Sequence, residues 1–293
     1  MTVTARRPFL EGLAAFTAVP LGAKDSARRH SPFERVVLGR TGISTTRLGF
    51  GTGVNSINRD SELLRRCGTE GAVRLLRAAY DRGLRYFDLA DTYGSHRLVA
   101  AAFKGLPRDS YVLATKYWWS SGGIPALDRA DAGTSIDRFL RELHTDYIDI
   151  VELHCVTSPK WPTELASHME ALAAAKNAGK IRAHGCSFHS CSALESAIGN
   201  KWIDVAHVRL NPYGRNMTSH PDRVLAQARN FHAAGKGVIA MKVLGVGSLK
   251  DKPGGIDKSL RWNLESGVSD VLNIGFTSLA EIEDIIRRIE ALA

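Results

Sequence analysis

The sequence of 293 residues has few cysteines and lacks long apolar runs. Its four cysteines form no C-x-x-C pair, which argues against a small disulfide-stabilised domain. No run of 18 apolar residues occurs, so we expect no membrane span. The net charge is +9, but no run of five basic residues occurs, so we expect no nucleic-acid partner. The dispersed positive charge suits a small anionic partner such as a phosphate-bearing cofactor.

A metal centre also lacks clear support. Cys186, His189 and Cys191 lie close together in C-S-F-H-S-C, and such residues can bind zinc. A zinc site needs a fourth ligand at suitable spacing, and none follows. We therefore interpret these residues as small core and loop residues and predict no metal.

The N-terminal 32 residues differ from the rest of the chain. The paired Arg6 and Arg7 precede Phe9-Leu10 and a mildly apolar stretch over 12–23. This order is typical of a twin-arginine export signal. A disordered basic extension is the alternative. A signal would place the protein in the periplasm or outside the cell, whereas an uncleaved extension would leave it in the cytoplasm.

From residue 33 onward, strand-like and helix-like segments alternate. Short apolar runs predict strands at Leu48–Thr52, Tyr86–Asp88, Val112–Lys116, Ile148–His154, Ala183–Ser187, Val205–Leu210, Val238–Lys242 and Val271–Ile274. Helices are expected at Glu70–Arg82, Arg97–Phe103, Ser135–His144, Glu164–Ala178, Ser192–Gly199, Asp222–Ala234, Lys258–Glu265 and Leu279–Ala291.

Eight strands, each followed by a helix, predict an α/β fold of the (β/α)8 TIM-barrel type over 33–293. The segment 33–47 has β-branched residues on both sides of G-R-T-G, which predicts an N-terminal β-hairpin. A doubly wound sheet is the alternative, but it normally has a G-x-G-x-x-G turn after its first strand. Here the segment is G-F-G-T-G-V-N, which lacks the third glycine spacing.

Four chemically distinct side chains lie at or just after successive strands. Asp88 ends the second, Lys116 the third and His154 the fourth, while Tyr93 follows Asp88 by five residues. Barrel active sites form at the carboxyl ends of the strands, so these side chains can surround one carbonyl group. Tyr93 can donate a proton, and we expect Lys116 to lower the pKa of its phenol. Asp88 would hold Lys116, and His154 would orient the substrate oxygen.

With these residues, the chain resembles the aldo-keto reductase family over roughly 34–290. The resemblance lies in V-V-L-G-R-T-G-I-S-T-T-R-L-G-F-G-T, F-D-L-A-D-T-Y-G, L-A-T-K, D-Y-I-D-I-V-E-L-H, G-K-I-R-A-H-G-C-S and I-G-F-T-S. It implies a (β/α)8 barrel that binds an extended NAD(P)H and a catalytic tetrad of Asp88, Tyr93, Lys116 and His154. The late M-K-V-L-G-V-G-S-L segment is similar to the bacterial short-loop branch.

The resemblance also implies a set of cofactor contacts. Ser187 matches a serine that holds the nicotinamide carboxamide, although Phe188 replaces the usual asparagine. Asn211 stands near a usual glutamine as a shorter substitute. Glu281 occupies a place where a basic residue often meets the 2′-phosphate, so NAD(H) is the alternative to NADP(H). The implied contacts are Gly51, Thr52, Asp88, Ser187, Asn211, Lys242, Gly275, Thr277, Ser278 and Glu281.

Aromatic residues near the predicted rim suggest a wall for a small-molecule substrate. Trp118 follows Lys116, and Trp161 lies after His154; ordinary loop packing is the alternative. We predict an oxidoreductase that reduces an aldehyde or ketone reversibly, as a monomer or weak oligomer. A nucleotide-binding sensor barrel with little catalysis is the second hypothesis. A metal-dependent lyase or hydrolase is the third, but the strand ends show no clear ligand cluster.

Overall fold

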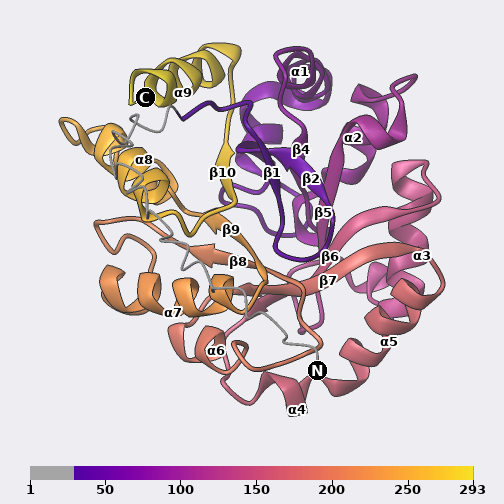
Figure 1. The fold of residues 1–293 in the computed structure, drawn as a ribbon. Helices are drawn as coiled ribbons and strands as arrows, with labels where there is room; N and C mark the ends of the chain where they lie inside the picture. Colours follow the sequence, from indigo (N-terminus) through magenta and orange to yellow (C-terminus); the bar gives the residue numbers. More distant parts are fainter. Residues whose placement is uncertain (1–29, 293) are drawn as a thin grey trace, which may run out of the picture.

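A computed structural model of the protein describes residues 30–292. Eight parallel strands close into a barrel, and the helices surround it on the outside (Figure 1). This confirms the predicted (β/α)8 class. The predicted export signal falls almost wholly on residues outside the described part. The barrel strands are β3 (Leu48–Gly51), β4 (Tyr86–Asp88), β5 (Val112–Tyr117), β6 (Ile148–Val156), β7 (Ile181–Phe188), β8 (Val205–Arg209), β9 (Gly237–Met241) and β10 (Val271–Gly275).

Eight of the helices in the described residues follow the predicted order, and the short α4 before α5 was not predicted as a separate helix. The helices are α1 (Glu62–Asp81), α2 (His96–Ala102), α3 (Ala132–Leu143), α4 (Trp161–Glu164), α5 (Ala166–Asn177), α6 (Cys191–Glu195), α7 (Pro221–Ala233), α8 (Gly255–Ser266) and α9 (Leu279–Ala291). Within residues 30–292, none of them combines the length and the apolar character that a membrane crossing requires.

The first helix starts earlier than predicted. The hydroxyl of Ser61 accepts a hydrogen bond from the Leu64 backbone N–H at 3.4 Å, which caps α1 at Glu62. Gly68, at φ 63°, interrupts the helical backbone, and the predicted helix began just beyond it at Glu70. The segment before Gly68 is therefore already helical, although its apolar periodicity alone predicted no helix there.

The predicted hairpin closes the amino end of the barrel. Strands β1 (Arg35–Val37) and β2 (Ser44–Thr46) pair antiparallel. Gly39, at φ 50°, lies so close to the start of β9 that a Cβ atom there would be 2.5 Å from the Gly237 nitrogen. The hairpin and the barrel interior share one buried apolar cluster, made of Val36, Leu38, Ile43, Tyr86, Val112, Ala114, Ile150, Ala183, Val205, Ile239 and Val271.

The inner face changes from apolar to polar toward the carboxyl ends of the strands. Side chains two residues apart in a strand share a face. In β6, Ile150 belongs to the apolar cluster, and Glu152 and His154 follow on the same face. In β8, His207 and Arg209 follow in the same way. The strand period thus places a layer of ionisable groups above an apolar base.

Gly185 tests how tightly the barrel strands pack. A Cβ atom on it would lie 2.0 Å from the Val205 carbonyl oxygen of the neighbouring strand β8. We expect Gly185→Ala to lower the free energy of unfolding by about 1–3 kcal/mol, because overpacking shifts the backbone. Gly199→Ala is the control, since nothing lies within 4 Å of its Cβ position. Urea titrations of both variants measure the difference, and equal unfolding midpoints would contradict this packing.

Candidate active site

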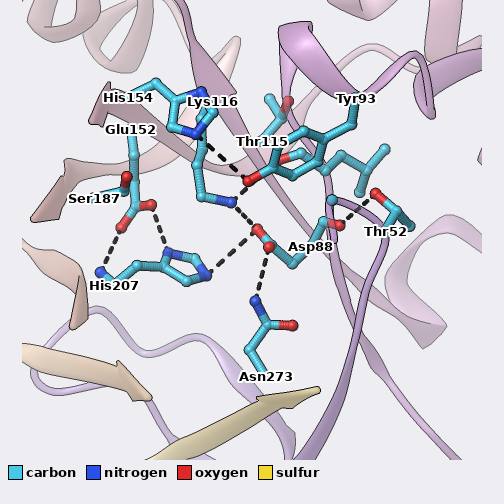
Figure 2. Close-up of polar contacts among 12 residues, drawn as sticks. Thr52, Asp88, Tyr93, Thr115, Lys116, Glu152, His154, Ser187, His207 and Asn273 are labelled. Atoms are coloured by element: carbon cyan, nitrogen blue, oxygen red, sulfur yellow. Dashed lines mark hydrogen bonds and ion pairs between the residues drawn. The ribbon is translucent and has the colours of Figure 1, made fainter. Parts of the chain in front are cut away.

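The structure brings the four predicted catalytic side chains together (Figure 2). Asp88 ends β4, Lys116 lies in β5, and His154 lies in β6. Tyr93 ends a short 3-10 helix after β4, and its hydroxyl lies 3.4 Å from His154 Nε2. All four residues are buried. The arrangement therefore presents a phenol and an imidazole side by side, with a charged pair beneath them.

The charged pair consists of Asp88 and Lys116. Lys116 Nζ donates to Asp88 Oδ1 and also to the Leu89 carbonyl at 3.1 Å. Asn273 Nδ2 donates to Asp88 Oδ2 at 2.7 Å. These bonds offset part of the cost of removing two charges from water. The sequence analysis missed Asn273, although it shares the inward face of the last barrel strand with Val271.

A second buried pair, Glu152 and His207, extends this network. Glu152 Oε2 lies 2.5 Å from His207 Nδ1, and His207 Nε2 lies 3.3 Å from Asp88 Oδ1 (Figure 2). Burial raises the pKa of Glu152 to about 8 and lowers that of His207 to about 3. Near pH 7 the Glu152 carboxyl is therefore protonated and the His207 imidazole is neutral. An acid two residues before His154 was the sequence signal for the pair, because both share one strand face.

The protonation of Tyr93 differs from our expectation. Burial, and next the nearby Asp88 carboxylate, raise the pKa of the phenol well above its ordinary value. The prediction that Lys116 lowers this pKa is therefore wrong. Asp88 pairs with Lys116 and balances its charge, so burial dominates. Tyr93 thus keeps its proton at neutral pH.

His154 is neutral for a related reason. Burial lowers its pKa well below the ordinary value, and the Lys116 charge adds to this. Within residues 30–292, its Nδ1 atom is buried and has no hydrogen-bond partner. A bare acceptor there costs less than an unpaired N–H, which favours the tautomer with the hydrogen on Nε2. That hydrogen points toward the Tyr93 hydroxyl.

A pocket runs from this cluster toward α1 and α9. Asp88 and Tyr93 form part of its wall, and the buried Asn273 Oδ1 has no hydrogen-bond partner within residues 30–292. Lys242 lines it too and makes no ion pair with the described residues. The lining residues include Gly51, Gly53, Val54, Arg66, Met241, Lys242, Leu244, Lys250, Gly275, Thr277 and Glu281. A free amide oxygen and an unpaired ammonium fit a nucleotide with hydroxyl and phosphate groups.

Six of the predicted cofactor residues line this pocket. Glu281 binds Lys250 at 2.6 Å and accepts a hydrogen bond from the Thr277 backbone N–H at 2.7 Å. Its carboxylate therefore takes up positive charge that a phosphate would otherwise meet. The six residues are Gly51, Asp88, Lys242, Gly275, Thr277 and Glu281.

The other four do not line it, because their side chains serve the protein itself. The Thr52 hydroxyl donates to the Asp88 carbonyl at 2.8 Å, and the Ser278 hydroxyl caps α9. Ser187 accepts a hydrogen bond from the Cys155 N–H at 3.1 Å. Asn211 bonds the backbone of its own loop, including Arg215, with both its amide nitrogen and its oxygen. The role of Asn211 as a substitute for a cofactor-binding glutamine stays a prediction.

The two predicted tryptophans lie in different environments. Trp118 packs edge-on to His154 with ring centroids 5.4 Å apart, so it stands beside the site. Its contact with a substrate stays a prediction. Trp161 is fully buried between Phe188 and Trp202, and its Nε1 donates to the Ser196 hydroxyl at 3.0 Å. The prediction for Trp161 is wrong, because the short helix α4 turns its indole into the core.

On the other side of His154 lies a group made of Cys155, His189 and Arg209. Cys155 Sγ lies 3.5 Å from His189 Nε2, and an Arg209 guanidinium nitrogen lies 2.5 Å from His189 Nδ1. His154, Cys155 and His189 have ligand atoms within 4.8 Å of one another. The fixed charge of Arg209 opposes a metal cation there. Burial also raises the pKa of Cys155 to about 11, which keeps the thiol protonated.

Comparison with known proteins gives consistent matches. The Aldo/keto reductase family model matches residues 47–288. Aldo-keto reductase YhdN of Bacillus subtilis is 31% identical over 166 residues, which cover 53% of this chain and 47% of that protein. Methylglyoxal reductase DkgB of Escherichia coli O157:H7 is 31% identical over 149 residues, or 49% of this chain and 54% of that protein. The match thus spans about half the length of each of these two relatives.

Solved structures agree in fold. The aldo-keto reductase AKR11C1 from Bacillus halodurans, solved in its holo form, matches with a TM-score of 0.66 at 19% identity. The match covers 89% of this chain and 96% of that one. With the family model spanning most of the barrel, these findings confirm the resemblance in the sequence: the chain belongs to the aldo/keto reductase family.

Proposed function

We propose that the protein is an NAD(P)H-dependent oxidoreductase that reduces an aldehyde or ketone to an alcohol, reversibly. The observation that carries this proposal is the Tyr93 hydroxyl, 3.4 Å from His154 Nε2 and above the Asp88–Lys116 pair. These groups stand at the inner end of a pocket that fits a nucleotide. Family membership supports the same chemistry.

In this proposal each side chain has one task. A bound nicotinamide supplies the hydride. Tyr93 holds a proton at its hydroxyl and gives it to the carbonyl oxygen, since its raised pKa keeps it protonated. His154 donates from Nε2 to the same oxygen and fixes its direction. Lys116 adds positive charge near the oxygen, and Asp88 holds Lys116 in place.

The pocket residues support the nucleotide assignment. Lys242 can meet the diphosphate, and Asn273 Oδ1 can accept a hydrogen bond from the nucleotide. Glu281 adds negative charge close to Thr277 at the start of α9. We therefore expect a reduced preference for NADPH over NADH.

Removal of the Tyr93 hydroxyl tests the reaction. General acid catalysis contributes about 10²–10⁴-fold, so we expect Tyr93→Phe to lower kcat/KM by about that factor. Turnover is followed at the nicotinamide absorbance band with a panel of aldehydes and ketones, and nucleotide affinity by fluorescence titration. Tyr147→Phe, a tyrosine that packs under Arg108, is the control. Nucleotide binding without turnover in the unmodified protein, across the panel, would favour the sensor hypothesis.

Charge reversal at Glu281 tests the nucleotide preference. Glu281→Arg replaces a carboxylate that repels the 2′-phosphate with a guanidinium that donates hydrogen bonds to it. We therefore expect the affinity for NADPH relative to NADH to rise about tenfold. Glu283→Arg on the same helix is the control, because Glu283 does not line the pocket and pairs with Arg82. Titrations with both nucleotides measure the ratio, and an unaltered ratio would overturn this role for Glu281.

The raised pKa of Glu152 predicts how stability depends on pH. Between its ordinary pKa of 4.5 and its folded value of about 8, the folded state keeps a proton that the unfolded state loses. Stability contributed by this group therefore falls as pH rises through that range. We expect Glu152→Gln, which mimics the protonated acid, to lose less stability between pH 6 and pH 8 than the unmodified protein. Urea titrations check this, with the exposed Glu170→Gln as control; parallel pH curves for Glu152→Gln and the unmodified protein would refute it.

A further inference from the structure

We propose that the substrate is an oxo acid, a carbonyl compound that also carries a carboxylate, and that Arg209 binds this carboxylate beside His154. The inference rests on the proposed function and narrows its substrate class. It starts from a cation that the described protein leaves without a counter-ion.

Arg209 has N–H donors that make no hydrogen bond within residues 30–292. One guanidinium nitrogen donates to the Asn216 carbonyl at 2.7 Å, and another lies 2.5 Å from His189 Nδ1. Its Nε atom is buried and has no hydrogen-bond partner within residues 30–292. No carboxylate of the described residues lies within 4 Å of its nitrogens, in contrast to the many paired arginines of this protein. Because a guanidinium carries five N–H donors, a ligand carboxylate can still bind.

Arg209 lies at the carboxyl rim of the barrel, at the end of β8. It follows His207 by two residues in β8, so it lies on the inner face of the barrel and nearer the carboxyl rim. His189 links it to the tetrad, because the rings of His189 and His154 meet edge to face with centroids 6.3 Å apart. Arg209 does not line the nucleotide pocket, which lies on the Tyr93 and Asp88 side.

The charges around the site favour an anion. Burial, and next the nearby charges of Arg209 and Lys116, lower the pKa of Lys242, so three cations lie close to one another. Against these three cations, Asp88 supplies one negative charge, since Glu152 stays protonated near pH 7. His189 accepts from Arg209 at Nδ1 and is neutral, so it adds no balancing charge. Partly buried cations without partners are costly, and a bound carboxylate would relieve that cost.

Two anions can meet these cations, the nucleotide diphosphate and a substrate carboxylate. Lys242 lines the nucleotide pocket together with Lys250, which assigns it to the diphosphate. Arg209 lies across the site, on the side of Cys155 and His189, where the substrate would extend away from the nucleotide. The geometry therefore favours the substrate as the source of its anion.

Matched acids and esters test the proposal. We would compare pyruvate with methyl pyruvate, and 4-carboxybenzaldehyde with its methyl ester, using the full chain and either nucleotide. We expect higher kcat/KM for each acid. In Arg209→Gln the acid-to-ester ratio should fall roughly 10- to 100-fold, the range of a charge-assisted hydrogen bond, and Arg209→Lys should restore part of it. Arg223→Gln, at an exposed arginine on α7, removes an equal charge and should keep the ratio.

Benzoate binding separates this proposal from the proposed function. Titration with benzoate, and with benzamide as the neutral match, can be followed by tryptophan fluorescence because Trp118 packs against His154. Arg209-dependent benzoate binding without any turnover would uphold the anion site and refute the reductase. If kcat/KM for each ester equals or exceeds that for its acid, in the unmodified protein and in Arg209→Gln alike, the anion site is refuted and the reductase is upheld. A loss confined to nucleotide affinity in Arg209→Gln would assign the anion to the diphosphate and overturn the proposal.

Discussion

The buried ion pair between Asp88 and Lys116 is the interaction on which the site depends. Two charges in the barrel interior are stable only where other groups complete their hydrogen bonds. Asn273 and the Leu89 carbonyl supply those bonds, and His207 Nε2, from the strand across the barrel, lies 3.3 Å from the Asp88 carboxylate. Loss of one partner leaves the other charge uncompensated, at a cost of about 3–5 kcal/mol. The groups beneath Tyr93 and His154 are therefore positioned only when the barrel strands that carry them have come together.

The strand period explains how one barrel holds both a core and a site. Each strand presents every second side chain to the interior. Near the amino ends these side chains are apolar and pack with the hairpin, and near the carboxyl ends they are ionisable. Two rim residues, Cys155 and Lys242, have φ of 59°, which is unfavourable for residues with a Cβ atom. Such strain is typical of functional rims, where packing around the strand ends maintains it.

Burial accounts for the protonation states in the site. Tyr93, Glu152, His154 and His207 all shift toward their neutral forms, because water is excluded from the barrel interior. Asp88 and Lys116 remain there as a directly paired set of opposite charges. A neutral phenol and a neutral imidazole are suited to donate hydrogen bonds to an oxygen that gains charge. Arg209, which has no carboxylate partner among residues 30–292, departs from this neutrality, and our proposal of a substrate carboxylate rests on that difference.

The sequence by itself determined the eight strands, the hairpin, the family and the four strand-end side chains. Those features depend on local apolar periodicity and on motifs within single segments, which can be recognised from the order of residues alone. Only the tertiary structure decided that Trp161 enters the core, that Asn211 serves its own loop, and that burial outweighs Lys116 at Tyr93. It also brought Glu152 together with His207, and Arg209 with His189. These outcomes depend on distances between different strands and on exclusion of water, and residue spacing along the chain carries neither.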